Sequence, residues 1–191
     1  MSGRAGDTSR IAPMTKHKIL INRAPVLTLW ASVVAERLGF DKDEALSLGK
    51  AVAGLTAQSK GRRLGIYKPV PQEIKKARSQ KRDEEFWVEL CGRPVPARST
   101  AEGVRAVNEN KPVEPKGVER YLASKFGDGL DAARKAMRDL AKTHKPQQLT
   151  AMAFRLYEQF RPNIPEGVTG WGAKGELDLG RIHSLAPKST S

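Results

Sequence analysis

The side chains of this sequence that are best suited to chemistry are cations, and they concentrate in two tracts. Residues 60–82 contain nine Lys or Arg side chains and one carboxylate, Glu73. Arg134, Arg138 and Lys142 are spaced four residues apart, which places them in one row along a helix. Such rows contact nucleic-acid phosphates, where each cation replaces a condensed counterion. The chemistry that these residues indicate is the binding of phosphate.

A further candidate is the segment "GWGAKG", residues 170–175. Trp171 lies between two glycines, so its indole can stack on a base while Lys174 contacts the adjoining phosphate. The alternative for Trp171 is a core position beneath a long loop. We expect the following residues to bind nucleic acid: Lys60, Arg62, Arg63, Lys68, Lys75, Lys76, Arg78, Arg134, Lys135, Arg138, Lys142, Trp171 and Lys174. The alternative for both basic tracts is a solvated face, and Asp131 and Asp139 could neutralise part of the second tract.

The other reactive side chains form no catalytic or metal-binding pattern in the sequence. His17, His144 and His183 are far apart and lack Cys or carboxylate companions at metal-site spacing. Cys91 could pair with a histidine as a nucleophile, but a single cysteine in a predicted strand is more often a small buried apolar residue. We therefore expect no cofactor and no metal. A nucleic-acid-binding role is favoured. Its main rival is a protein-protein interaction scaffold, and an enzyme of unfamiliar type is a third alternative.

The overall charge agrees with a polyanionic partner. The chain has 191 residues, a formal net charge of +13 and an isoelectric point near 10.1. Nucleic acid is the most common polyanion in a cytoplasm, although the charge could serve solubility alone. No apolar run approaches the roughly 20 residues needed to cross a bilayer, the first residues lack a secretory apolar region, and the single cysteine fits a reducing compartment. We expect a cytoplasmic protein and no membrane partner; the nucleoid and the ribosome are two locations that it could occupy there.

Two helices are predicted near the N-terminus, after a flexible tail at residues 1–15. Pro25 suits a first helical turn, an apolar stripe that includes Trp30 continues to Leu38, and Gly39 is a good stop. The stripe predicts that Trp30 is a core residue. Because the stripe is so apolar, helix 25–38 could alternatively bury a partner helix or form a homodimer.

The second helix is predicted to begin with a capping box of Asp41 and Glu44 and to end at Gly61. The two helices would form an αα-hairpin. Small residues would let another helix approach closely, namely Gly49, Ala53, Gly54 and Ala57. The stretch "SKGRRLG" follows this helix, whereas a phosphate-binding P-loop precedes one, so we interpret it as an exposed cationic turn. Whether residues 72–84 form an exposed helix or a flexible arm stays open.

The middle of the chain is predicted to contain one strand and one short helix. Residues 85–92 alternate apolar and polar side chains, and the prolines that follow favour a turn or extended chain. Residues 99–107 could form a short helix capped by Ser99 and Glu102. Residues 108–117, with two prolines and a glycine, are the clearest linker.

Three further helices are predicted at residues 116–126, 128–144 and 146–160, with Leu156 in the core. The following segment is rich in loops, and "DLGRIHSL" forms one last turn of helix. Residues 112–160, with two helices joined by "GDG", resemble the helix-two-turn-helix unit of ribosomal small-subunit proteins and some DNA-repair glycosylases. That resemblance implies backbone binding through helix ends and loops. The glycosylases' catalytic amino-terminal proline is absent, so their chemistry is not implied.

These patterns predict a mainly α protein, a compact helical bundle. It has an αα-hairpin near the N-terminus, a minor strand or hairpin near residues 85–97, and a three-helix C-terminal part. The predicted divisions are the tail, residues 16–107, the linker 108–117, and residues 118–191, with one continuous core as an alternative. As a whole the chain is similar to small basic bacterial proteins, which implies no activity. The predicted function is binding of DNA or structured RNA through the phosphate backbone, with little sequence specificity.

Overall fold

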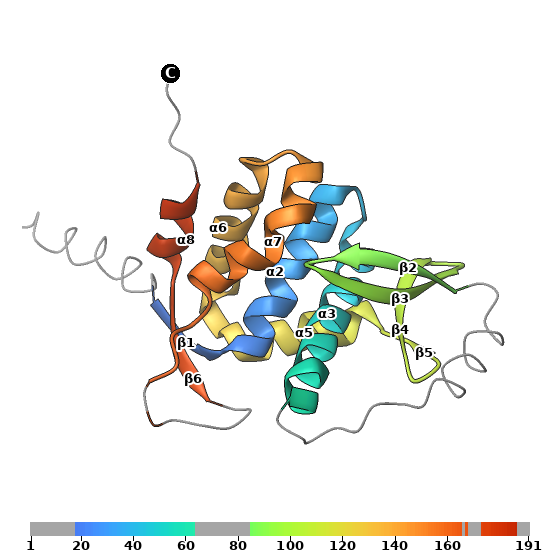
Figure 1. Ribbon diagram of the computed structural model, residues 1–191, viewed down its shortest axis with the longest axis horizontal. Helices are drawn as coiled ribbons and strands as arrows, with labels where there is room; N and C mark the ends of the chain where they lie inside the picture. Colours follow the sequence, from blue (N-terminus) through green and yellow to red (C-terminus); the bar gives the residue numbers. More distant parts are fainter. Residues whose placement is uncertain (1–17, 64–84, 166, 168–172, 187–191) are drawn as a thin grey trace, which may run out of the picture.

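A computed structural model describes residues 18–63, 85–165, 167 and 173–186 (Figure 1). The elements, in chain order, are β1 Lys18–Asn22, α2 Arg23–Leu38, α3 Lys42–Arg63, β2 Glu85–Leu90, β3 Arg93–Thr100, β4 Gly103–Asn108, β5 Lys111–Pro112, α5 Pro115–Phe126, the 3-10 helix η2 Gly127–Gly129, α6 Leu130–Lys142, α7 Pro146–Phe160, β6 Lys174–Asp178 and α8 Leu179–Leu185. The strands form a two-stranded sheet, β1-β6, and a four-stranded sheet, β2-β3-β4-β5. The predicted mainly α bundle is therefore wrong, because the chain has a mixed α and β fold.

Helix α2 is the central element of the core. All of its residues from Pro25 to Ala35 are buried, and α3, α5, α6 and α7 contact it (Figure 1). Trp30 has no exposed surface, which confirms its predicted core position, and its ring meets Phe160 edge-on with centroids 5.3 Å apart. The apolar surface that we considered for a dimer is thus already buried within the protein's own core.

The predicted αα-hairpin is present, and its signals at Gly39 and Asp41 act as expected. Gly39 ends α2 in the left-handed region at φ 115°, where glycine carries no Cβ penalty. The amide of Glu44 donates to Asp41 Oδ1 at 2.8 Å, and the amide of Asp41 donates to Glu44 Oε1 at 3.0 Å, so the capping box is confirmed. A Cβ at Gly49 would lie 2.6 Å from the carbonyl oxygen of Thr28, so this glycine permits close packing of α3 on α2. Gly54 has open space around it and has no such role.

Two of the tight hairpins in the four-stranded sheet have turns with the same backbone conformation. Cys91 and Gly92 link β2 to β3, and Glu109 and Asn110 link β4 to β5, all four with positive φ. Two-residue turns with positive φ at both positions match the right-handed twist of the strands they connect. Residues 85–90 confirm the predicted strand.

The sequence prediction failed in the next part of the sheet. Residues predicted as a short helix from 99 to 107 instead form the end of β3 and most of β4, with Ser99 opposite Val104. Cross-strand pairing outweighed the apparent Ser99–Glu102 cap, because the apolar side chains of β4 are buried when the strand pairs with β3. The predicted linker 108–117 contains β5 and the first turn of α5.

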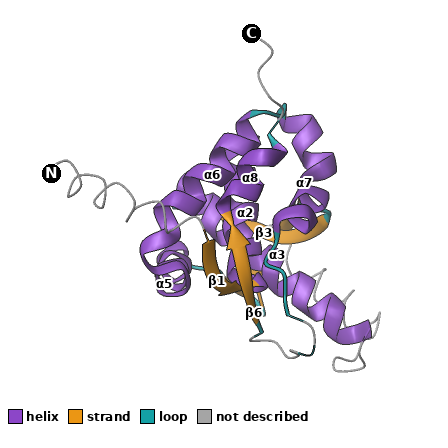
Figure 2. Cartoon of the chain, turned by 90° about the vertical axis from the view of Figure 1, so that its left-hand side faces the viewer, coloured by secondary structure: helices purple, strands orange, loops and turns teal. Residues whose placement is uncertain are grey.

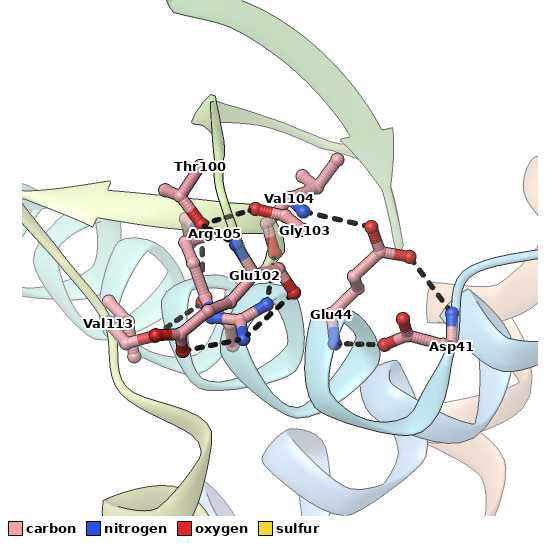
Figure 3. Close-up of polar contacts among 10 residues, drawn as sticks. Asp41, Glu44, Thr100, Glu102, Gly103, Val104, Arg105 and Val113 are labelled. Atoms are coloured by element: carbon pink, nitrogen blue, oxygen red, sulfur yellow. Dashed lines mark hydrogen bonds and ion pairs between the residues drawn. The ribbon is translucent and has the colours of Figure 1, made fainter.

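Helix α3 is attached to the four-stranded sheet by polar contacts that are buried or partly buried. The second carboxylate oxygen of Glu44 accepts the amide of Val104 at 2.8 Å (Figure 3). The hydroxyl of Ser47, fully buried, donates to the carbonyl of Val113 at 2.7 Å and accepts the amide of Ala106 at 2.9 Å. Glu44, which caps α3, therefore also holds the first residues of β4 in place.

The two-stranded sheet joins the two ends of the described chain. Strand β1 pairs antiparallel with β6, with Leu20 opposite Glu176, and Figure 2 shows the two strands side by side. Ile21 and Leu177 point into the core. β1 was not predicted, and β6 lies within the segment that we interpreted as loop.

The C-terminal helices follow the predicted ranges closely. α5, α6 and α7 confirm the predictions for residues 116–126, 128–144 and 146–160, and Leu156 is buried as predicted. α8 confirms the last helical turn. None of the helices within the described ranges is both long and apolar enough to cross a membrane. Gly61 does not cap α3, because the helix continues to Arg63.

Candidate nucleic-acid interface

Helix α6 separates a buried apolar face from a charged outer face. Leu130, Met137 and Leu140 point into the core, whereas Lys135 and Lys142 are exposed. The helix is held against α2 and α8 (Figure 2). This packing fixes the predicted row of cations at the surface, beside the core stripe, as the spacing indicated.

The row lines an open depression of about 450 Å³ together with the first residue of α3. Its lining consists of five cations and two carboxylates: Lys42, Arg134, Lys135, Arg138, Lys142, Asp131 and Asp139. We call this surface the α6 basic face. Its excess of cations favours an anionic ligand, and it contains no aromatic side chain on which a base could stack.

Three cations of the α6 basic face are held by carboxylates. Arg134 Nη2 lies 2.8 Å from an oxygen of Glu119 on α5, and the Arg134 side chain is 11% exposed. Lys135 Nζ lies 2.8 Å from Asp139 one turn along the helix. The third pair, Arg138 with Glu36 of α2, has a separation of 3.2 Å. These ion pairs orient the cations and also reduce the net charge that the face presents.

Nearby cations favour the ionised forms of Glu119 and Asp139. The hydrogen bond from Arg134 is the largest cause that lowers the pKa of Glu119, and the charges of Arg134, Lys42 and Arg138 add to it. For Asp139, the hydrogen bond from Lys135 is the largest cause of a lowered pKa. Both groups are therefore anionic at neutral pH, and a phosphate must compete with them.

Lys42 and Lys142 are the cations of the face with the weakest internal partners. Lys42 is 58% exposed and lies 3.9 Å from Glu119, at the limit of an ion pair. Lys142 is exposed and forms no ion pair with any residue that the structure describes. These two lysines and the exposed Lys135 are best placed to bind phosphate without disturbing the fold.

Among the other predicted contacts, Lys174 is the one whose side chain the structure describes. Lys60, Arg62 and Arg63 lie in the last turns of α3, where the structure describes the backbone alone. Lys174 lies on β6 opposite Asn22 and does not line the depression. The remaining predicted residues, Lys68, Lys75, Lys76, Arg78 and Trp171, lie outside the described residues.

Sequence reasoning missed Lys42, which lines the depression. Lys42 follows the helix cap Asp41, and no sequence spacing connects it with residues 134–142. Lys116 and Arg120 are exposed on α5, one turn apart, on either side of Glu119 in the sequence. Their spacing of four residues is the same signal that indicated the row on α6, but neither residue lines the depression.

Cys91 is unsuited to nucleophilic chemistry. Its side chain is buried, and burial raises the pKa of its thiol to about 12. Because the thiolate is the reactive form, almost none of it is present at neutral pH. The backbone at Cys91 has φ 49°, which is the conformation that the β2–β3 turn requires.

No protein-family model, curated protein or solved structure matches this chain. The α6 basic face and the composition are therefore the features of this protein that indicate a function. The helix-two-turn-helix resemblance of residues 112–160 stays a prediction; in the structure, α5, η2 and α6 follow one another directly there.

Proposed function

We propose that the protein binds DNA or structured RNA through the phosphate backbone, with little base preference. The observation that carries this proposal is the open depression on α6, lined by five cations and two carboxylates. Helix α6 is packed against α2 and α8 through its buried face, so its cations project from the opposite side. The formal charge of +13 supplies long-range attraction to the same ligand.

The spacing along α6 suits a polymer of phosphates. Arg138 and Lys142 are four residues apart, which corresponds to about 6 Å along a helix. Successive phosphates on one strand have a similar separation, so neighbouring cations can contact neighbouring phosphates. Contacts of this kind position the protein and carry no sequence information. We expect this activity in the cytoplasm, as the composition predicts.

A salt titration tests the proposal. The affinity of the full-length protein for a labelled random duplex, DNA or RNA, is measured between about 50 and 200 mM salt. We expect the logarithm of the association constant to fall linearly with the logarithm of the salt concentration, with a slope near −0.9 for each phosphate contact on B-DNA. Absence of binding at the lowest salt, or binding that is independent of salt, would refute the proposal.

A further inference from the structure

Glu119 is a carboxylate that engages two cations of the α6 basic face, Arg134 and Lys42. Its carboxylate accepts a hydrogen bond from Arg134 Nη2 at 2.8 Å and lies 3.9 Å from Lys42 Nζ. Arg138 also acts electrostatically on it. All three cations line the depression, whereas Glu119 itself does not. The carboxylate therefore lies behind the ligand surface and neutralises it from within.

This arrangement limits what a phosphate can contact. Arg134 is the most buried cation of the face, with 11% of its side chain exposed. A guanidinium recognises a carboxylate and a phosphoryl group with the same donors. A ligand reaches Arg134 only by displacing the carboxylate or by binding beside it, against repulsion of like charges. Glu119 is itself 34% exposed, so it can be displaced towards solvent without unfolding α5.

We propose that Glu119 is an internal competitor, a resident anion that sets the affinity of the α6 basic face for phosphoryl groups. The ligand chemistry is a phosphoryl oxyanion, from a nucleic-acid backbone or from a free polyphosphate. The inference rests on the proposed function for the choice of this face. It goes further by assigning a residue that weakens binding, on a helix that contributes none of the cations lining the depression.

Glu119→Gln tests this role, because the amide keeps the shape of the side chain and removes its charge. Binding is measured by calorimetry at about 0.1 M salt with two probes, a labelled random duplex and inorganic pyrophosphate, and the duplex titration is repeated between about 50 and 200 mM salt. We expect the variant to bind both probes about 3- to 10-fold more tightly than the wild-type protein. The salt slope for the duplex should steepen by about 0.9, since Arg134 becomes available for one further contact.

Glu158→Gln is the matched control. Glu158 is exposed on α7, away from α5 in Figure 2, and its substitution removes the same single negative charge. Screening at about 0.1 M salt confines surface electrostatics to roughly 10 Å, so this control should change neither affinity by more than about 1.5-fold. Glu119→Asp is the second variant, to be used if the amide variant does not fold. It keeps the charge but withdraws it from Arg134, so its affinities should lie between those of the wild-type protein and those expected for the amide.

The two probes separate this inference from the proposed function. If neither the wild-type protein nor any variant binds the duplex, but Glu119→Gln binds pyrophosphate more tightly than the wild-type protein, the inference stands and the nucleic-acid function is wrong. If the wild-type protein binds the duplex and Glu119→Gln gains no more affinity than Glu158→Gln, the function stands and the inference is overturned. An affinity of Glu119→Asp equal to that of the wild-type protein would also overturn it.

Discussion

The indole N–H of Trp30 donates a hydrogen bond of 2.8 Å to the backbone carbonyl of Ala153, buried in the core and 123 residues away in the sequence. It ties the central helix α2 to α7. The ring also packs edge-on against Phe160 of the same helix. One side chain therefore supplies both apolar burial and a directional contact between two elements that are far apart in the chain.

Trp30→Phe should lower the free energy of unfolding by about 1–3 kcal/mol, because it removes the buried donor and leaves unfilled volume. Equilibrium unfolding in urea measures the change. Trp87→Phe is the matched control, since Trp87 is 67% exposed on β2, and surface changes of this kind cost less than about 0.5 kcal/mol. An equal decrease in the free energy of unfolding of the two variants would show that the contact with Ala153 contributes nothing to stability.

The β4–β5 turn predicts a stabilising substitution. Glu109 has φ 50°, a conformation that asparagine and glycine adopt more readily than glutamate. Glu109→Asn should therefore raise the free energy of unfolding by about 0.3–1 kcal/mol. Glu109→Gln removes the same charge without favouring positive φ, so it should leave stability unchanged. If both variants were equally stabilised, charge rather than backbone conformation would be the cause.

Local signals explain how much of this fold could be predicted. The caps at Gly39 and Asp41 and the apolar stripes of the helices are contained within a few residues, and the helices they predicted are present. β1 and β6 pair across more than 150 residues, so no local pattern in "KILIN" or "KGELD" specifies the partner. The segment 99–107 was misassigned for a related reason. Its capping pattern is local, whereas its structure is decided by the pairing of β4 with β3.

The candidate site divides in the same way. The spacing of Arg134, Arg138 and Lys142 predicted one row beside a core stripe, and the structure shows that row. The partners of the row could not be predicted, because Glu36 and Glu119 reach it only through the packing of α2 and α5 against α6. The two aspartates of α6 itself suggested only local pairing, which occurs between Lys135 and Asp139.

The lowered pKa of Glu119 predicts a pH-dependent contribution to stability. A carboxyl whose pKa is lower in the folded state stabilises the protein above its unfolded pKa of about 4.3, and this stability is lost as the pH falls through the folded pKa. Glu119→Gln lacks this contribution. The difference in free energy of unfolding between wild type and variant should therefore shrink between pH 7 and about pH 3, as measured by urea unfolding at several pH values. A difference that stays constant over this range would contradict the assignment.

The raised pKa of Cys91 predicts an unreactive thiol. In the native protein at pH 8, a disulfide reagent such as DTNB should label Cys91 far more slowly than a free cysteine, because the thiol is buried and protonated. In about 6 M guanidinium, which unfolds most domains, the same thiol should react at once. Rapid labelling of the native protein would show that this turn opens readily.

The most direct test of the proposed function compares salt slopes of duplex binding. Lys135→Ala/Lys142→Ala removes two exposed cations of the α6 basic face, whereas Lys111→Ala removes an exposed cation from the β4–β5 hairpin, on the other side of the molecule in Figure 1. We predict that the double variant keeps its melting temperature within about 2 °C, since surface substitutions cost little. Its slope should shrink by up to about 1.8, with weaker binding to every duplex sequence, while Lys111→Ala keeps the wild-type slope. A slope that is unchanged in the double variant would contradict the assignment of this face to nucleic-acid binding.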